Sequence, residues 1–223
     1  MTNNSIKPSS TKSLKDQLIS NNYIEQHWIL NNTNQNLYIG YNCLKQSQKI
    51  EEIEIYNKLI YNNDDLIDLN DDCNIIINDD DGDDGDGVGD LLKDKLPSSP
   101  ISNHLIAIFN LGQQLTSHPN TIHGGLTATL IDEYFIKCCL NLINSNNNGD
   151  NDNTTTELVA YTGNLNISYK KAIIVPVDDT VQVWLSCYIS SIQGRKVTIK
   201  GQLSSVGFKD IYCIGEVLAI VAK

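Results

Sequence analysis

The sequence predicts an α+β fold in which one long helix lies on an antiparallel sheet. A short apolar run at 104–112, HLIAIFNLG, ends in Gly and fits a buried strand. The segment 122–142 carries apolar residues on more than one side of a helix, which indicates an enclosed helix. Several strand-like segments follow, and tight turns between the last three of them predict an antiparallel meander.

The part of the chain before the first strand changes composition twice. Residues 1–61 are interpreted as an N-terminal extension with short helices at 14–21 (LKDQLISN) and 49–61 (KIEEIEIYNKLIY), because the apolar residues have helix-like spacing. Residues 62–95 form an acidic, low-complexity insertion that is expected to be disordered. Its Asp-Gly repeats fit no register of an EF-hand calcium loop, so a solvated loop is the simpler interpretation. Residues 96–223 are expected to form the folded domain.

The elements after the helix are predicted from alternation and turn residues. A polar run at 144–156, NSNNNGDNDNTTT, is typical of a loop. β-Branched and aromatic residues then recur with partial alternation in segments that fit strands. These segments are 158–173, 179–192, 195–206 and 211–222, with turns at 193–194 (QG) and 207–210 (GFKD).

Charge and cysteine content exclude several classes of protein. A net charge of −11 over 223 residues argues against a nucleic-acid-binding protein, because phosphate binding needs a basic surface. No stretch approaches the roughly 20 apolar residues of a membrane span. The N-terminus has no secretory signal and is rich in Ser, Thr and Lys but lacks Arg, so the expected compartment is the mitochondrion or the cytoplasm. The 6 cysteines form no C-x-x-C pair, so reduced thiols are expected and no metal site is predicted.

Three motifs carry a resemblance to a known family. They are TIHGGLTATLIDE at 121–133, YTGNLNISYKKAI at 161–173 and SIQGRKVTIKGQL at 191–203. In this order they resemble the hotdog-fold acyl-CoA thioesterases with a His-Gly-Gly-x6-Asp signature, over roughly residues 101–223. Residues 1–60 resemble, more loosely, the helical extension of fungal-type members. The resemblance implies an antiparallel sheet wrapped around one central helix, and hydrolysis of acyl-CoA to free fatty acid and CoA without a cofactor or metal.

The resemblance also implies roles for particular residues. Asp132 matches the catalytic carboxylate, which acts either as general base on water or as nucleophile. The backbone N–H of Gly125 is the expected principal donor to the thioester oxygen, and Gly124 lets that oxygen approach the start of the helix. His123 is expected to orient this turn rather than act as a base. Thr162 matches a hydroxyl that positions water or assists the carboxylate, although a strand Thr is also explained by β-propensity.

Coenzyme A carries phosphates, so this acidic chain must supply local cations. The candidates are Lys170, Lys171, Arg195 and Lys196.

Three positions depart from the family pattern and leave the rate and the acyl specificity open. Ala172 stands where many relatives have Pro, Ser117 where some have Asn, and Asn120 where Gly is usual.

The spacing of Gly125 and Asp132 predicts a homodimer. The two residues are seven positions, or two helical turns, apart, which separates them by about 10.5 Å along the axis. A single thioester carbonyl cannot contact both within one chain. If both act, the donor and the carboxylate must come from different subunits, and such dimers could pair further into tetramers.

Two other functions remain open at this point. A non-catalytic acyl-CoA-binding hotdog protein would bind ligand without turnover and would tolerate Asp132→Asn. A hotdog dehydratase or hydratase would need a His–Asp pair in a different local motif, and the sequence contains no such second motif.

Overall fold

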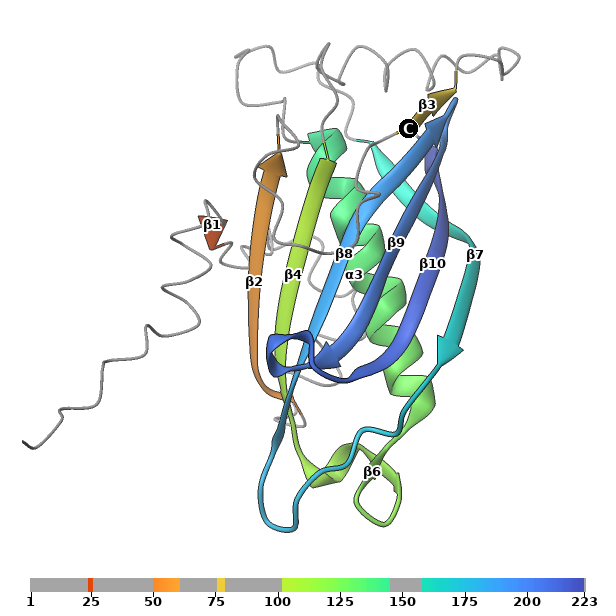
Figure 1. The fold of residues 1–223 in the computed structure, drawn as a ribbon. Helices are drawn as coiled ribbons and strands as arrows, with labels where there is room; N and C mark the ends of the chain where they lie inside the picture. The colour runs from red at the N-terminus through yellow and green to blue at the C-terminus, as the bar shows by residue number, and fades with distance from the viewer. Residues whose placement is uncertain (1–23, 26–49, 61–75, 79–101, 145–157, 223) are drawn as a thin grey trace, which may run out of the picture.

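The computed structural model describes residues 24–25, 50–60, 76–78, 102–144 and 158–222. One long helix, α3 (Gly124–Asn144), lies in the concave face of a strongly curved sheet (Figure 1). The strands are β1 (Ile24–Glu25), β2 (Ile50–Ile60), β3 (Ile76–Asn78), β4 (Ser102–Leu111), β7 (Val159–Tyr169), β8 (Val181–Gln193), β9 (Lys196–Ser205) and β10 (Ile211–Ala222). Their order across the sheet is β1-β2-β4-β8-β9-β10-β7, and β3 pairs with the end of β8. The predicted α+β hotdog architecture is confirmed.

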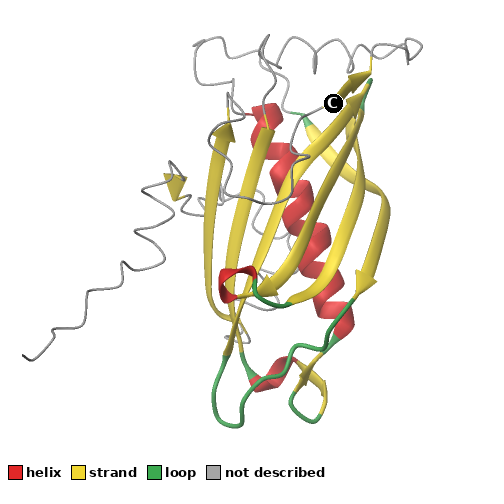
Figure 2. Cartoon of the chain, viewed as in Figure 1, coloured by secondary structure: helices red, strands yellow, loops and turns green. Residues whose placement is uncertain are grey.

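All neighbours along this order pair antiparallel, and only the short β3 runs parallel to its neighbour. Figure 2 shows the strands in yellow curling around the single long helix. The predicted turns are also present, because Gly194 and Gly207 adopt φ values of 52° and 71° in the left-handed region that glycine tolerates. As the last strand in the order, β7 pairs with β10 alone among the described residues.

The helix packs on the sheet through a wide apolar stripe. Pairs of adjacent residues recur every four positions along it, and their side chains are almost fully buried. These residues are Leu130, Ile131, Tyr134, Phe135, Cys138, Cys139, Leu142 and Ile143. The close approach requires glycine on the facing strand, since a Cβ on Gly215 of β10 would lie 2.8 Å from Ile131 Cγ2. The core thus fixes the position of α3 against β10.

The predicted helix at 49–61 is wrong. Residues Ile50–Ile60 form strand β2, which pairs antiparallel with β4. The sequence Ile53-Glu54-Ile55 alternates with period two and is rich in β-branched residues, so it fits a strand once a neighbour offers a ladder of hydrogen bonds. This part of the expected N-terminal extension therefore belongs to the main sheet. The other predicted helix, at 14–21, lies outside the described residues.

Disorder was expected throughout the acidic insertion, and for Ile76–Asn78 this is wrong. These residues form β3 and pair with residues 191–193 at the end of β8. Three apolar or β-branched positions interrupt the acidic run at this point, which gives the chain a short segment able to join a sheet. The rest of the insertion lies outside the described residues.

Candidate active site

The start of α3 is held in place by a small hairpin that the sequence did not predict. Strands β5 (Thr116–His118) and β6 (Thr121–Ile122) pair just before the helix. Asn120 in their turn has φ 58°, a left-handed conformation that Asn tolerates better than most residues, which explains how it replaces the usual Gly. Its carbonyl accepts the Val175 N–H at 2.8 Å, and the His123 N–H donates to the Leu115 carbonyl at 3.0 Å. The His-Gly-Gly turn therefore starts from a fixed backbone.

His123 caps the helix through its ring. The Gly125 N–H donates to His123 Nδ1 at 2.8 Å, so in the neutral ring the proton sits on Nε2. This bond satisfies one of the donors that a helix start leaves without an intrahelical partner. A Cβ on Gly125 would lie 2.8 Å from both Cε1 and Nδ1 of that ring, so glycine is required for the contact. The geometry suits an orienting role for His123, and it shows that the Gly125 N–H is engaged by the His123 ring.

Gly124 is held from the other side by Tyr169, a residue that the sequence analysis missed. The Tyr169 hydroxyl donates to the Gly124 carbonyl at 2.9 Å. Partial burial, with a smaller effect of Cys213, raises the pKa of Tyr169, so its hydroxyl remains a donor well above neutral pH. Among the described residues, the Gly124 N–H makes no hydrogen bond. It is therefore an open donor at the positive end of the helix dipole.

The structure brings Asp132 and Thr162 together. Thr162 Oγ1 on β7 donates to Asp132 Oδ1 on α3 at 2.6 Å, the length of a charge-assisted O–H···O bond. Strand β7 has a β-bulge next to Thr162. The register between β10 and β7 shifts between Leu218 and Ala219, which leaves Gly163 as the extra residue. A Cβ on Gly163 would lie 2.9 Å from Ile220 Cγ1, so only glycine fits the bulge. The glycine inside an otherwise regular strand sequence was the available signal for this feature.

The predicted cations fall into two separate pairs. Lys170 and Lys171 follow β7 beside the start of α3, where both backbone N–H groups donate to the Tyr212 carbonyl. They line a pocket of about 350 Å³ together with Thr121, Ile122, Gly124, Thr127, Tyr169, Ala172, Ile173 and Tyr212. Lys171 Nζ also pairs with Asp210 Oδ1 at 2.9 Å.

Arg195 and Lys196 lie at the opposite end of the sheet. The Arg195 carbonyl accepts the Val221 N–H, and Val221 pairs with Ala160 near the beginning of β7. Strand β7 runs from this end to the start of α3 (Figure 1). One chain therefore does not bring all the predicted cations to one place.

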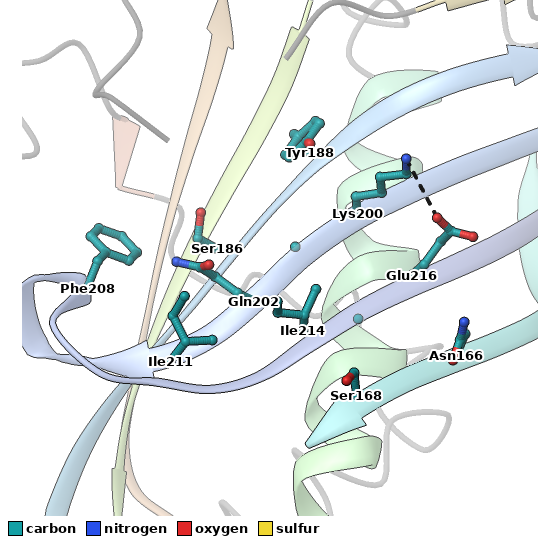
Figure 3. Close-up of a pocket in the computed structure, with 12 residues that line it drawn as sticks. Asn166, Ser168, Ser186, Tyr188, Lys200, Gln202, Phe208, Ile211, Ile214 and Glu216 are labelled. Carbon is teal, nitrogen blue, oxygen red and sulfur yellow. Dashed lines mark ion pairs between the residues drawn. The ribbon is translucent and has the colours of Figure 1, made fainter. Parts of the chain in front are cut away.

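A larger cavity lies away from these residues. It has a volume of about 540 Å³ and opens on the sheet face opposite α3 (Figure 3). Phe208, Ile211 and Ile214 line one part, and the Lys200–Glu216 ion pair at 3.7 Å lines another. No predicted site residue borders it. The candidate site is therefore the α3–β7 side of the molecule and not this cavity.

The four cysteines within the described part of the chain are buried thiols, and none of them forms a disulfide there: Cys138, Cys139, Cys187 and Cys213. Burial raises the pKa of Cys213 to about 11, against the lesser opposing effect of a backbone hydrogen bond at Leu203. Such a thiol is a poor nucleophile at neutral pH.

The described residues contain no cluster of His, Cys, Asp or Glu suited to hold a metal ion. No helix within the described ranges combines the length and the apolar character needed to cross a membrane.

Comparison with known proteins was made on sequence and on structure. No protein-family model matches the chain. Over 112 residues the chain is 30% identical to the acyl-coenzyme A thioesterase THEM4 of Mus musculus. This covers 50% of the chain and 40% of that relative, so the chain spans less than half of the relative's length.

Solved structures give weaker likenesses. A thioesterase from Haemophilus influenzae is 9% identical with a TM-score of 0.43, covering 54% of this chain and 72% of that one. The BH2602 protein from Bacillus halodurans, solved with CoA, is 20% identical with a TM-score of 0.40, covering 52% and 66%. Scores of this size support no functional argument.

The match to a curated acyl-CoA thioesterase agrees with the three motifs that suggested the same superfamily. In its motifs, its architecture and half of its sequence, the chain thus resembles the hotdog-fold acyl-CoA thioesterases.

Proposed function

We propose that this protein hydrolyses the thioester of acyl-CoA to a free fatty acid and CoA. The observation that carries the proposal is the 2.6 Å hydrogen bond from Thr162 to Asp132, which holds a carboxylate beside an edge strand. The Thr162 hydroxyl occupies Oδ1 and fixes the plane of the carboxylate. Oδ2 makes no hydrogen bond among the described residues, so it is available to a water molecule or to the thioester carbon.

In the general-base form of the reaction, Asp132 takes a proton from water as the water oxygen bonds to the thioester carbon. The carbonyl oxygen becomes negative and is stabilised by the Gly125 N–H, next to the open Gly124 N–H. The C–S bond then breaks, and the proton passes from Asp132 to the CoA sulfur. In the alternative form, Asp132 attacks the carbon itself and water releases the acyl group afterwards.

The carbonyl oxygen must replace His123 at the Gly125 N–H. Because the His123 ring accepts that hydrogen bond, the ring must turn aside or share the donor when substrate binds. The exchange conserves the number of hydrogen bonds at the helix start, so its cost is small. His123 in this scheme keeps the turn in shape until substrate arrives.

We also propose that two subunits pair through β7. Among the described residues no strand pairs with the outer edge of β7, which is eleven residues long, and proteins usually cover such edges. Two identical edges related by a two-fold axis pair antiparallel. The end of β7 beside Gly125 then meets the beginning of the partner's β7. Such a pairing would bring the partner subunit's Asp132 toward Gly125, whereas the same chain's Asp132 is about 10.5 Å away along the helix axis.

The same pairing offers a phosphate site. Lys170 and Lys171 after the end of β7 would then lie at the same end of the joined sheet as the partner subunit's Arg195 and Lys196, which are separated from the interface by β7 and β10. Together they would supply positive charge for CoA phosphates on an otherwise acidic chain.

The test measures thiol release from acyl-CoAs of short to long chain length. Wild type is compared with Asp132→Asn and with Asp178→Asn, a matched amide substitution at an exposed loop residue. We expect kcat to fall by about 10²-fold or more in Asp132→Asn and to stay unchanged in the control. Equal turnover by wild type and Asp132→Asn would refute the assigned role of the carboxylate.

Oligomeric state is measured on the same samples by light scattering. A dimer has twice the chain mass of 24.8 kDa. An active monomer would refute the two-subunit site.

A non-catalytic acyl-CoA-binding protein is the second candidate. It is favoured by one observation, the engagement of the Gly125 N–H by His123. Calorimetric binding of acyl-CoA to a folded dimer that releases no thiol would select this candidate over the hydrolase.

A further inference from the structure

The peptide group that joins Gly124 to Gly125 is held at both ends. Its carbonyl oxygen accepts the Tyr169 hydroxyl at 2.9 Å, and its N–H donates to His123 Nδ1 at 2.8 Å. The first contact comes from the sheet and the second from the residue just before the helix. This peptide carries the N–H that the proposed reaction uses.

A peptide between two glycines is less restrained than the other peptides of the helix. Neither flanking residue has a Cβ to restrict its torsions, so the plane of the group is set by the hydrogen bonds of the first turn of α3 together with the contacts to Tyr169 and His123. A tilt would swing the Gly125 N–H away from the thioester oxygen. A hydrogen bond to the carbonyl oxygen opposes that tilt, and it also polarises the amide so that its N–H becomes a stronger donor.

Tyr169 is well placed to provide that hydrogen bond. It is the last residue of β7, the strand that also carries Thr162. Its ring lies beside the helix start, with Cε1 at 3.7 Å from the position that a Cβ on Gly124 would occupy. When substrate displaces His123 from the Gly125 N–H, the hydrogen bond from Tyr169 to the Gly124 carbonyl remains.

We propose that Tyr169 is a positioning residue for thioester hydrolysis, whose hydroxyl keeps the Gly124–Gly125 peptide turned so that the Gly125 N–H faces the reacting oxygen. The inference rests on the proposed hydrolase function and assigns a further residue to that site. Tyr169 acts through the backbone and does not itself touch the thioester. Removal of its hydroxyl therefore affects the transition state more than substrate binding.

The variant that tests this is Tyr169→Phe, which keeps the ring and removes the donor. The matched control is Tyr161→Phe on the same strand. Tyr161 is 63% exposed. Successive residues of a strand point to opposite faces of the sheet, and Thr162 faces α3, so Tyr161 points away from α3. Steady-state kinetics use the acyl-CoA that wild type hydrolyses fastest, and a ¹⁵N–¹H spectrum reports the Gly125 amide in each protein.

We expect kcat of Tyr169→Phe to fall about five- to tenfold while KM changes less than about twofold, as for the loss of one positioning hydrogen bond. The Gly125 amide resonance should shift in this variant and not in Tyr161→Phe. Unchanged kcat in Tyr169→Phe, with wild type active, overturns the inference and leaves the proposed function standing. If wild type does not hydrolyse acyl-CoA, the proposed function itself is overturned. If the Gly125 resonance does not shift in Tyr169→Phe, the hydrogen bond from Tyr169 does not position this peptide, whatever the activity.

Discussion

Replacing Thr162 by Val removes the hydroxyl that holds Asp132 and keeps the shape of the side chain. The lost contact is a 2.6 Å hydrogen bond to a carboxylate. Hydrogen bonds to charged groups contribute about 1.5–3 kcal/mol when buried. Because Thr162 is exposed and Asp132 only half-buried, we expect a contribution at or just below the lower limit of that range, about 1–1.5 kcal/mol. This corresponds to a five- to tenfold loss of kcat/KM, since about 1.4 kcal/mol is a factor of ten.

The assay for this prediction is thiol release at neutral pH, with Thr162→Ser as the control that retains the hydroxyl. Ser should keep most of the activity, while Val should lose it by the factor above. The free energy of unfolding should change by less than about 1 kcal/mol in both variants, because the position is exposed. If Val is as active as Ser, Thr162 is a strand residue selected for β-propensity and does not assist Asp132.

Two further predictions follow from the same region. Gly125→Ala places a Cβ 2.8 Å from the His123 ring, so the ring can no longer hold the turn in shape and the Gly125 N–H loses its orientation; we expect kcat to fall more than tenfold. Gly124→Ala meets only ordinary contact at 3.7 Å and serves as its control; equal losses in both variants would contradict the assignment of Gly125. The second prediction concerns Cys213. Burial raises the pKa of its thiol from 9.0 to about 11. The unfolded thiol ionises first, so the free energy of unfolding should be constant below pH 9 and fall between pH 9 and 11. Denaturant titrations at pH 8 and pH 10.5 measure this, and Cys213→Ala should weaken the fall; an identical fall in that variant would assign it to other groups.

The fold was largely predictable because local patterns and the core agree. Glycines at the turns after β8 and β9, and an apolar run on several sides of α3, each indicated the element that forms. Segment 49–61 was misread because its apolar residues also fit a helix, and only pairing with β4 decides between the two structures. Such a contact joins residues about fifty positions apart, so no local pattern contains it.

The site was predictable in its residues and not in its contacts. The motif named Asp132, Gly125 and Thr162, yet the bond between Asp132 and Thr162 depends on a bulge at Gly163 that only the strand pairing reveals. Tyr169 could not be found at all from the sequence. An aromatic residue at the end of a strand is already explained by β-propensity, and its hydrogen bond to Gly124 appears only when helix and sheet are placed together.

The arrangement of charges gives a second reason to expect two subunits, independent of the spacing of Gly125 and Asp132. With a net charge of −11, the chain repels a polyphosphate at long range, so binding must depend on cations close to the phosphates. Lys170 and Lys171 follow the end of β7, and Arg195 and Lys196 lie at the turn between β8 and β9, at the opposite end of the sheet. At about 3.3 Å per residue, the length of the strands keeps the two pairs some 30 Å apart within a chain. Antiparallel pairing of two β7 edges would put the two pairs at the same end of the joined sheet, about three strand spacings or roughly 15 Å apart, because β10 lies between β9 and β7. The charge-reversal variant Arg195→Glu should therefore raise KM for acyl-CoA in the dimer by acting on a site whose other cations belong to the opposite subunit.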